Sequence, residues 1–262
     1  MIEFLKQSTF EVGEVTQKAW EITMKNYISI ALLCFLMFAT LSLSGLFSFF
    51  FNEVNQFLKF LFFIVFIGFY FIINLTLLKY IFYLIDHEED HLSIKDSLPT
   101  KIQIINFLVG NLMFSLCILA VYIVVALLVF PFIYTGLNLQ ILINIAISVG
   151  LVAIFITWIR ISFFPFFIID RNSSPFTSLK FSLAITKGNF TKIVILLFFL
   201  ASFQLLYLFL NYINLNFIAT CVNVFSSFII VPLSSVALAL AYRQMMSDYK
   251  GQEQPDILHN II

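Results

Sequence analysis

The chain has 262 residues, of which 61% are hydrophobic and 11% are charged, with 35 phenylalanines and no formal net charge. A soluble domain usually carries about 25% charged residues. Together with a mean hydropathy of +1.04, this composition excludes a soluble globular protein and predicts an all-α, polytopic membrane protein. The first 26 residues hold no apolar run long enough for a signal peptide, so we expect the first span to direct insertion.

The N-terminal region is amphipathic. We expect a helix over residues 8–25 within an N-terminal cytoplasmic segment of residues 1–26. Ser8 and Glu11 have capping-box spacing, and the apolar and charged residues that follow separate onto two faces. Such a helix can lie along the membrane surface with Trp20 as an interfacial anchor, or cover the cytoplasmic end of the helix bundle.

Six apolar runs follow, each long enough to cross about 30 Å of hydrocarbon. They are continuous rather than alternating, which favours helices over β-strands. We therefore expect a six-helix transmembrane domain over residues 27–243 and a cytoplasmic tail over residues 244–262. The spans are predicted at 27–51, 60–85, 104–130, 139–160, 191–213 and 217–242.

The positive charges fix the expected orientation. Lysine and arginine precede span one, follow span six, and lie between spans two and three and between spans four and five; the opposite connections hold only Lys59. The positive-inside rule therefore predicts that both termini are cytoplasmic. The expected partners are membrane lipids and other inner-membrane proteins. Basic residues lie near acidic ones, so no nucleic-acid surface is predicted.

A charged segment separates spans four and five. Ser174 is placed as an N-cap, Pro175 as the first helical residue and Gly188 as the end of a helix, which predicts a short cytoplasmic helix over residues 175–187. Its apolar residues occupy more than one face, so we expect it to lie between the membrane surface and the rest of the protein.

Span four continues apolar beyond Arg160, and Pro165 is expected to break or kink it. The break leaves Arg160 near the cytoplasmic interface, where it can reach the headgroup layer or pair with Asp170. An arginine inside a membrane is a candidate functional residue, but the shallow depth of Arg160 favours a structural role.

Part of the sequence is repeated. Ile22–Tyr27 resembles Ile185–Phe190, because both segments begin with Ile-Thr and end with asparagine and an aromatic residue. A weaker copy at 92–107, with Ser93 and Asp96 as a possible cap followed by Asn106-Phe107, lies between these two along the chain and is therefore the middle copy. This pattern predicts a unit of one surface helix and one transmembrane hairpin, used two or three times in the same orientation.

Several segments also carry a family resemblance. They are Arg160, Pro165, Asp170, Thr186-Lys187-Gly188-Asn189, Tyr242-Arg243, and the segments at 19–27 and 239–245. In these the chain resembles bacterial six-helix membrane proteins, namely the YciC-like proteins and the membrane region fused to some glycerophosphoryl diester phosphodiesterases. The resemblance implies the six-helix topology and a bacterial inner membrane but no catalytic residues, and the phosphodiesterase domain itself is absent from this sequence.

One motif matches a catalytic pattern. His87-Glu88-Glu89-Asp90-His91 fits H-E-x-x-H, in which two histidines on one helical face bind zinc and the glutamate activates water. Its charged central pair and its place at the end of span two instead favour a solvated acidic loop. His87 and His91 therefore remain remote candidates for a metal site. The three cysteines lie alone in apolar runs, and no cofactor is expected.

The remaining candidates are polar residues in or near the spans. Asn74 and Lys79 lie in span two, and Arg243 ends span six. No aspartate or glutamate lies inside any predicted span, which disfavours an ion-coupled transporter. Hydrogen bonding between helices is the simpler explanation for the polar residues.

These observations lead to three hypotheses. The first is a non-catalytic accessory or assembly subunit of an inner-membrane protein complex. The second is a lipid-handling protein, or a small-molecule carrier or channel, that uses polar residues of spans two and six such as Asn74. The third, a zinc metallopeptidase at residues 87–91, is the most remote.

Overall fold

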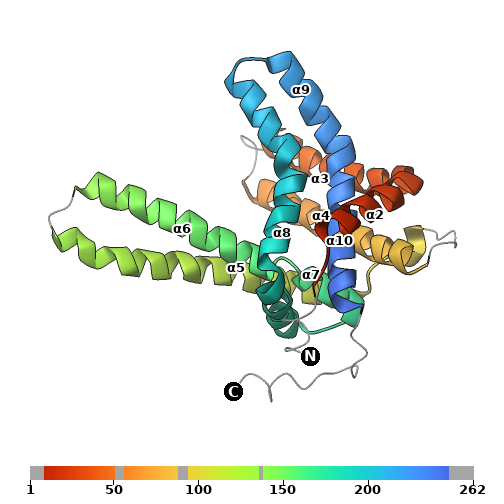
Figure 1. Ribbon diagram of the computed structural model, residues 1–262, viewed down its shortest axis with the longest axis horizontal. Coiled ribbons are helices and arrows are strands. Elements are labelled where there is room, and N and C mark those ends of the chain that lie inside the picture. The colour runs from red at the N-terminus through yellow and green to blue at the C-terminus, as the bar shows by residue number, and fades with distance from the viewer. Residues whose placement is uncertain (1–8, 51–55, 88–93, 136–137, 248–262) are drawn as a thin grey trace. The chain divides into compact units, whose positions relative to one another are not determined.

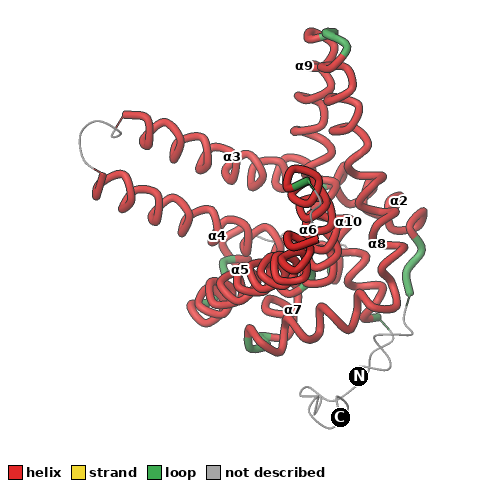
Figure 2. The backbone as a smooth tube through the Cα atoms, turned by 90° about the vertical axis from the view of Figure 1, so that its left-hand side faces the viewer, coloured by secondary structure: helices red, strands yellow, loops and turns green. Residues whose placement is uncertain are grey.

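The computed structural model describes residues 9–50, 56–87, 94–135 and 138–247. Helices make up nearly all of this part of the chain, and it contains no strand (Figure 2). The predicted all-α class is therefore confirmed. The described residues form six helices that are long and apolar enough to cross a membrane, as predicted: Tyr27–Phe50, Gln56–Asp86, Lys101–Phe132, Gln140–Arg171, Pro175–Tyr212 and Asn216–Met246.

The chain divides into two compact units. In the described part, unit 1 holds residues 105–193 and unit 2 holds residues 9–104 and 194–247. Two long helices, α5 (Lys101–Val129) and α8 (Pro175–Tyr212), contribute to both units.

Unit 1 is a helical hairpin followed by a sharp change of direction. Helix α5 is followed by the short turn η2 (Phe130–Thr135) and by α6 (Leu139–Ile161), which returns beside it (Figure 1). Helix α6 ends at Ile161, and α7 (Phe164–Arg171) begins with Pro165 in its first turn. The expected break near Pro165 is therefore present. Helix α7 stops at Asn172, which adopts the left-handed conformation that asparagine tolerates better than most residues.

Unit 2 is built around α10 (Val231–Met246), which packs against α2 (Val12–Lys25), α3 (Tyr27–Phe50) and α4 (Gln56–Asp86). Its sixth span is the most buried of the six: half of its most apolar segment is inside the protein, against 6–22% for the other five. Alanines such as Ala237 and Ala241 are fully buried and allow neighbouring helices to approach closely.

The N-terminal helix begins later than expected. Helix α2 starts at Val12, and its N-cap is Glu11, whose side chain makes no capping hydrogen bond. Ser8, the expected cap, lies outside the described residues. The buried residues of α2 face α10, which fits a helix that covers the end of the bundle, while Trp20 remains 46% exposed. Its role as a membrane anchor stays a prediction.

The short helix expected at 175–187 is wrong as a separate element. Helix α8 runs without a break from Pro175 to Tyr212. Gly188 does not end it, because the apolar span that follows continues the helix, and the neighbouring Asn189 donates to the carbonyl of Ile185 within it. The predicted start is confirmed: the Ser178 amide donates to the Ser174 carbonyl.

The sixth span contains a local change of helical pitch. Between α9 (Asn216–Phe225) and α10 lies a π-helical turn, η3 (Ser226–Ile230), in which the Val231 amide donates to the carbonyl of Ser226. Pro232 has no amide hydrogen for the carbonyl of Phe228, four residues earlier. The hydroxyl of Tyr27 on α3 donates to that carbonyl at 3.0 Å. Tyr27 therefore satisfies an acceptor that the proline leaves free.

This contact makes the effect of Tyr27→Phe depend on Pro232. We expect Tyr27→Phe to lower the free energy of unfolding by about 1 kcal/mol in the native chain. The loss should be smaller in a Pro232→Ala background, because alanine restores an amide donor. Thermal unfolding of the four purified proteins in detergent measures this coupling. Equal losses in both backgrounds would contradict the assigned role of Tyr27.

Candidate functional site

In unit 1, polar groups concentrate where α6 and α7 meet the first turns of α8. The carbonyl of Arg160, in the last turn of α6, accepts from Ser182 Oγ at 2.9 Å and from Thr186 Oγ1 at 3.1 Å. The amide of Phe163 donates to Ser182 Oγ at 3.0 Å. Both hydroxyl-bearing residues are fully buried. The side chains of α8 thus replace the hydrogen bonds that the helix break removes.

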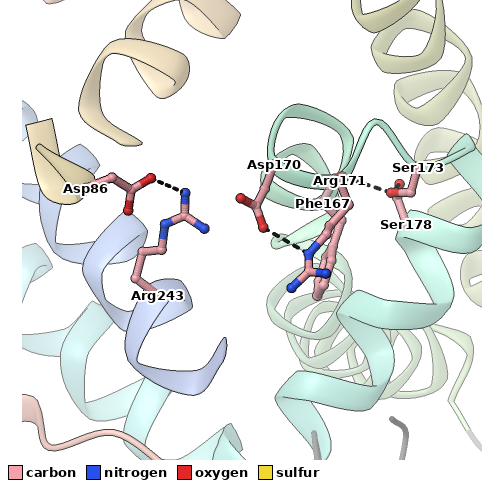
Figure 3. Close-up of polar contacts among 7 residues, drawn as sticks. All are labelled: Asp86, Phe167, Asp170, Arg171, Ser173, Ser178 and Arg243. Carbon is pink, nitrogen blue, oxygen red and sulfur yellow. Dashed lines mark hydrogen bonds and ion pairs between the residues drawn. The ribbon is translucent and has the colours of Figure 1, made fainter. Parts of the chain in front are cut away.

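The Arg160 side chain also contacts α8. Its Nη2 donates to the carbonyl of Leu183 at 3.4 Å, and its Nε is buried without a hydrogen-bond partner in the described part of the chain. Asp170, the predicted partner of Arg160, instead pairs with the adjacent Arg171 at 3.4 Å (Figure 3). The structure therefore places Arg160 against α8, and the expected pairing with Asp170 is not formed.

The loop between α7 and α8 is fixed by serines. Ser173 Oγ donates to the carbonyl of Phe167 and lies 2.7 Å from Ser178 Oγ (Figure 3). Asn106 on α5 donates to the carbonyl of Ser173 at 3.4 Å. These contacts connect three helices of unit 1, and every polar atom in them has a structural partner.

In unit 2, Arg243 joins the ends of spans two and six. Its Nη2 lies 2.6 Å from Asp86 Oδ2 (Figure 3), and its guanidinium lies 4.5 Å from the centre of the Phe82 ring. The Tyr242 ring also packs against Phe82, with ring centres 5.5 Å apart. An ion pair together with a cation–π contact fits an anchor between two helix ends.

Lys79 and Asn74 have different surroundings on α4. Lys79 Nζ donates to the carbonyl of Leu98 at 2.9 Å and so holds the segment that precedes α5. The Asn74 side chain is half-buried and makes no hydrogen bond to any residue that the structure describes. Thr76, two residues later, bonds to the carbonyl of Ile72 in its own helix. Of these three residues, Asn74 is the one whose side chain forms no hydrogen bond with the described part of the protein.

The zinc hypothesis gains no support from the described residues. Helix α4 ends at Asp86, one residue before His87, whose ring stacks on Tyr83 with centres 4.3 Å apart. Residues 88–91, including His91, lie outside the described residues. Within those that are described, no three His, Cys, Asp or Glu side chains gather into a metal site.

The structure extends the repeat that the sequence suggested. Helices α2 and α8 begin at aligned positions, Val12 and Pro175. Asn26 and Asn189 are also aligned, and each donates through Nδ2 to the isoleucine carbonyl four residues earlier, at 3.3 and 3.0 Å. The same local arrangement therefore occurs in the first and third copies.

Three of the aligned positions also agree in burial. Each helix buries three residues spaced four apart, and Trp20 and its counterpart Leu183 are exposed. The buried sets are Val15, Ala19 and Thr23 in α2 and Ser178, Ser182 and Thr186 in α8. Helix α8 also buries positions whose counterparts in α2 are not buried, namely Leu179, Phe181, Ala184 and Ile185. Sequence comparison missed this agreement because the sets differ in polarity at two of three positions, where Val15 and Ala19 align with Ser178 and Ser182.

The surface segments follow one packing rule. Helix α2 packs on α10, and the turn η1 (Ile94–Ser97), which replaces a surface helix in the middle copy, packs on α4. The first turns of α8 hold the end of α6 through Ser182 and Thr186. Helices α4, α6 and α10 are each the second helix of a hairpin. In each copy, therefore, the segment that precedes a hairpin packs on the second helix of a different hairpin, and this contact recurs with the repeat.

In comparisons with known proteins, no protein-family model, no curated protein and no solved structure matches the chain. The resemblance to the YciC-like proteins and to the phosphodiesterase membrane region therefore stays a prediction. Within the described residues all regular secondary structure is helical, and six helices are long and apolar enough to cross a membrane.

Proposed function

We propose that the chain is a non-catalytic protein of the bacterial inner membrane, with both termini cytoplasmic, that acts as an accessory or assembly subunit of a membrane protein complex. The observation that carries this proposal is the exposure of its spans. In five of the six, only 6–22% of the most apolar segment is buried within the chain. Packing against helices of another protein can cover such a surface, alongside lipid.

The polar residues of the spans fit the same role. Many bond to carbonyls of their own helix, as Thr40, Thr157 and Ser148 do, at 2.7–2.9 Å. Such bonds leave the outer surface apolar and suited to packing. Arg160 and Arg243 hold helix ends.

A photo-crosslinking amino acid placed in α6 tests the proposal. Leu151 is 63% exposed and Leu142 is 5% exposed, so the two positions form a matched pair on one helix. In native membranes, a crosslinker at Leu151 should give one discrete adduct with a second protein. The same group at Leu142 should give none. Adducts with lipid alone at Leu151, and at Leu112 on α5, would reject a protein partner on these helices.

A lipid-handling protein, or a small-molecule carrier or channel, is the second candidate. Asn74 favours it, because a polar side chain without a hydrogen bond is costly in a membrane unless it serves a ligand or a partner. If this function is right, Asn74→Leu should abolish transfer of lipid or solute between vesicles while thermal stability stays within about 0.5 kcal/mol of the native value.

Thr76→Val is the control for this test, because Thr76 lies on the same helix but bonds to its own backbone. It should leave transfer unchanged. If Asn74→Leu raises stability and leaves transfer intact, Asn74 has no part in a transport path, and the carrier hypothesis loses the residue that supports it.

A further inference from the structure

Helix α2 and the first turns of α8 are aligned copies of one surface segment, but the two are held very differently. Over the aligned stretches 12–25 and 175–188, three of the 14 residues are buried in α2 and seven are buried in α8. The three buried residues of α2 are Val15, Ala19 and Thr23, spaced four apart. The contact of α2 with α10 is therefore a narrow strip, whereas α8 is buried over a wider part of its circumference.

Side-chain hydrogen bonds hold α8 to α6 and are missing from the buried strip of α2. Ser182 Oγ and Thr186 Oγ1 both donate to the carbonyl of Arg160, at 2.9 and 3.1 Å. Their counterparts in α2 are Ala19, which has no polar side-chain group, and Thr23. The Thr23 hydroxyl is buried and has no hydrogen-bond partner among the described residues. Because a buried hydroxyl without a partner is unfavourable, the α2 contact is weakened where the α8 contact is strengthened.

The chain after α2 allows this helix to move as a unit. Helix α2 ends at Lys25, and a turn at Asn26 separates it from α3, whereas the aligned Asn189 lies inside the continuous α8. Directly after the turn, the hydroxyl of Tyr27 donates to the carbonyl of Phe228 and so holds the start of α3. A rotation at Asn26 would therefore move α2 and leave α3 in place.

The remaining sides of α2 are already suited to water. Glu14, Lys18, Glu21 and Lys25 are all exposed, and the acidic residues precede the basic ones by four residues, the spacing at which opposite charges interact on a helix. Release of α2 from α10 would therefore add only the narrow buried strip to the surface of this helix.

We propose that α2 is a releasable cover of α10: it detaches by rotation at Asn26 while α3 keeps its place, and the aligned first turns of α8 stay fixed to α6. Local opening of this kind is expected where few apolar contacts and few hydrogen bonds hold a segment. The unpartnered hydroxyl of Thr23 shifts the balance toward release. The device is independent of a protein partner on the spans, because it involves the helix that precedes them.

Thiol labelling at aligned positions tests this proposal. Ala19 and Ser182 are counterparts in the repeat, and both are fully buried. Two full-length proteins carry Ala19→Cys or Ser182→Cys in a background that lacks the three native cysteines, through Cys34→Ala, Cys117→Ala and Cys221→Ala. Each protein is reconstituted in lipid nanodiscs, which leave both faces of the bilayer open, and is treated with a membrane-impermeant maleimide. The labelling rate then reports how often each buried position opens to water.

The proposal expects the Ala19→Cys protein to be labelled at least about tenfold faster than the Ser182→Cys protein. Thr23→Val, added to Ala19→Cys, should slow labelling about fivefold, because valine keeps the shape of threonine and removes the unpartnered hydroxyl. Thr16→Val is the matched control on α2. The hydroxyl of Thr16 donates to the carbonyl of Val12 in its own helix at 3.0 Å, so its loss should leave the labelling rate unchanged.

Equal labelling rates for the Ala19→Cys and Ser182→Cys proteins would overturn the proposal. Equal effects of Thr23→Val and Thr16→Val would also overturn it, because the buried hydroxyl would then have no particular part in the contact with α10. Labelling of both proteins after denaturation in detergent confirms that the two thiols react alike once they are exposed. Circular dichroism of every variant shows whether the helices remain folded.

If the Ser182→Cys protein does not fold, hydrogen exchange of the unsubstituted chain in nanodiscs gives the same comparison. An isolated helix of this length is only marginally stable in water, so a released α2 loses part of its helical structure and its amides exchange. The amides of residues 12–25 should therefore exchange at least about tenfold faster than those of residues 175–188. Equal protection of the two segments would reject the release of α2.

Discussion

Gly110→Ala should lower the free energy of unfolding by about 1–3 kcal/mol, the range typical of overpacking. In an exposed helix the same change usually stabilises by about 1 kcal/mol. A Cβ atom at Gly110 on α5 would lie 2.7 Å from Cε2 and 3.1 Å from Cδ2 of Phe164 on α7. Phe164 cannot easily move, because its ring lies between those of Phe107 and Phe114 and is 4% exposed.

Gly45→Ala and Gly68→Ala are matched controls, because a Cβ atom at either position meets nothing within 4 Å. They should leave the thermal unfolding temperature in detergent unchanged or raise it. Phe164→Leu should relieve part of the loss caused by Gly110→Ala, since leucine lacks the ring atoms that the new methyl group meets. If Gly110→Ala behaves like the two controls, the close approach of α5 and α7 is not a feature of the folded protein.

Ser182→Ala should lower the free energy of unfolding by about 1–3 kcal/mol, because it leaves the buried amide of Phe163 without its acceptor. The Arg160 carbonyl would lose one donor but keep Thr186. Thr186→Val should therefore cost less than Ser182→Ala. Thermal unfolding in detergent measures both changes.

Ser202→Ala provides the control on the same helix. Ser202 Oγ donates to the carbonyl of Phe199 within α8 and touches no other element through that bond. Its loss should change stability by less than about 0.5 kcal/mol. A similar loss for Ser202→Ala and Ser182→Ala would show that the contact between α6 and α8 adds nothing beyond an ordinary hydroxyl bond to backbone.

The apolar spans could be predicted closely because hydrophobic length is a direct physical requirement of the bilayer. The first was expected at 27–51, and α3 covers Tyr27–Phe50; the break before Pro165 was also expected. Gly188 misled the prediction. A glycine ends a helix when the residues that follow leave it, but here an apolar span follows and favours continuation.

The contacts between distant residues could not be predicted from local pattern. The sequence singled out Arg160 and Asp170 as partners because their charges are opposite, whereas the structure brings Arg160 to the Leu183 carbonyl. Arg243 and Asp86 are 157 positions apart, and no spacing rule connects them. Tyr27 and Phe228 meet for a reason that was present in the sequence, the missing amide of Pro232, but the donor could come from any neighbouring helix.

The continuity of α8 has a mechanical consequence. Its 38 residues form one helix about 57 Å long, with no glycine break, proline or π-turn after its first residue to absorb bending. In the first copy, a turn at Asn26 separates the surface helix α2 from α3. A pull on the surface end of α8 would therefore tilt the whole rod, and each degree of tilt shifts one end by about 1 Å relative to the other. In the third copy the surface segment and the span therefore move together as one helix, whereas in the first copy the turn at Asn26 allows them to move separately.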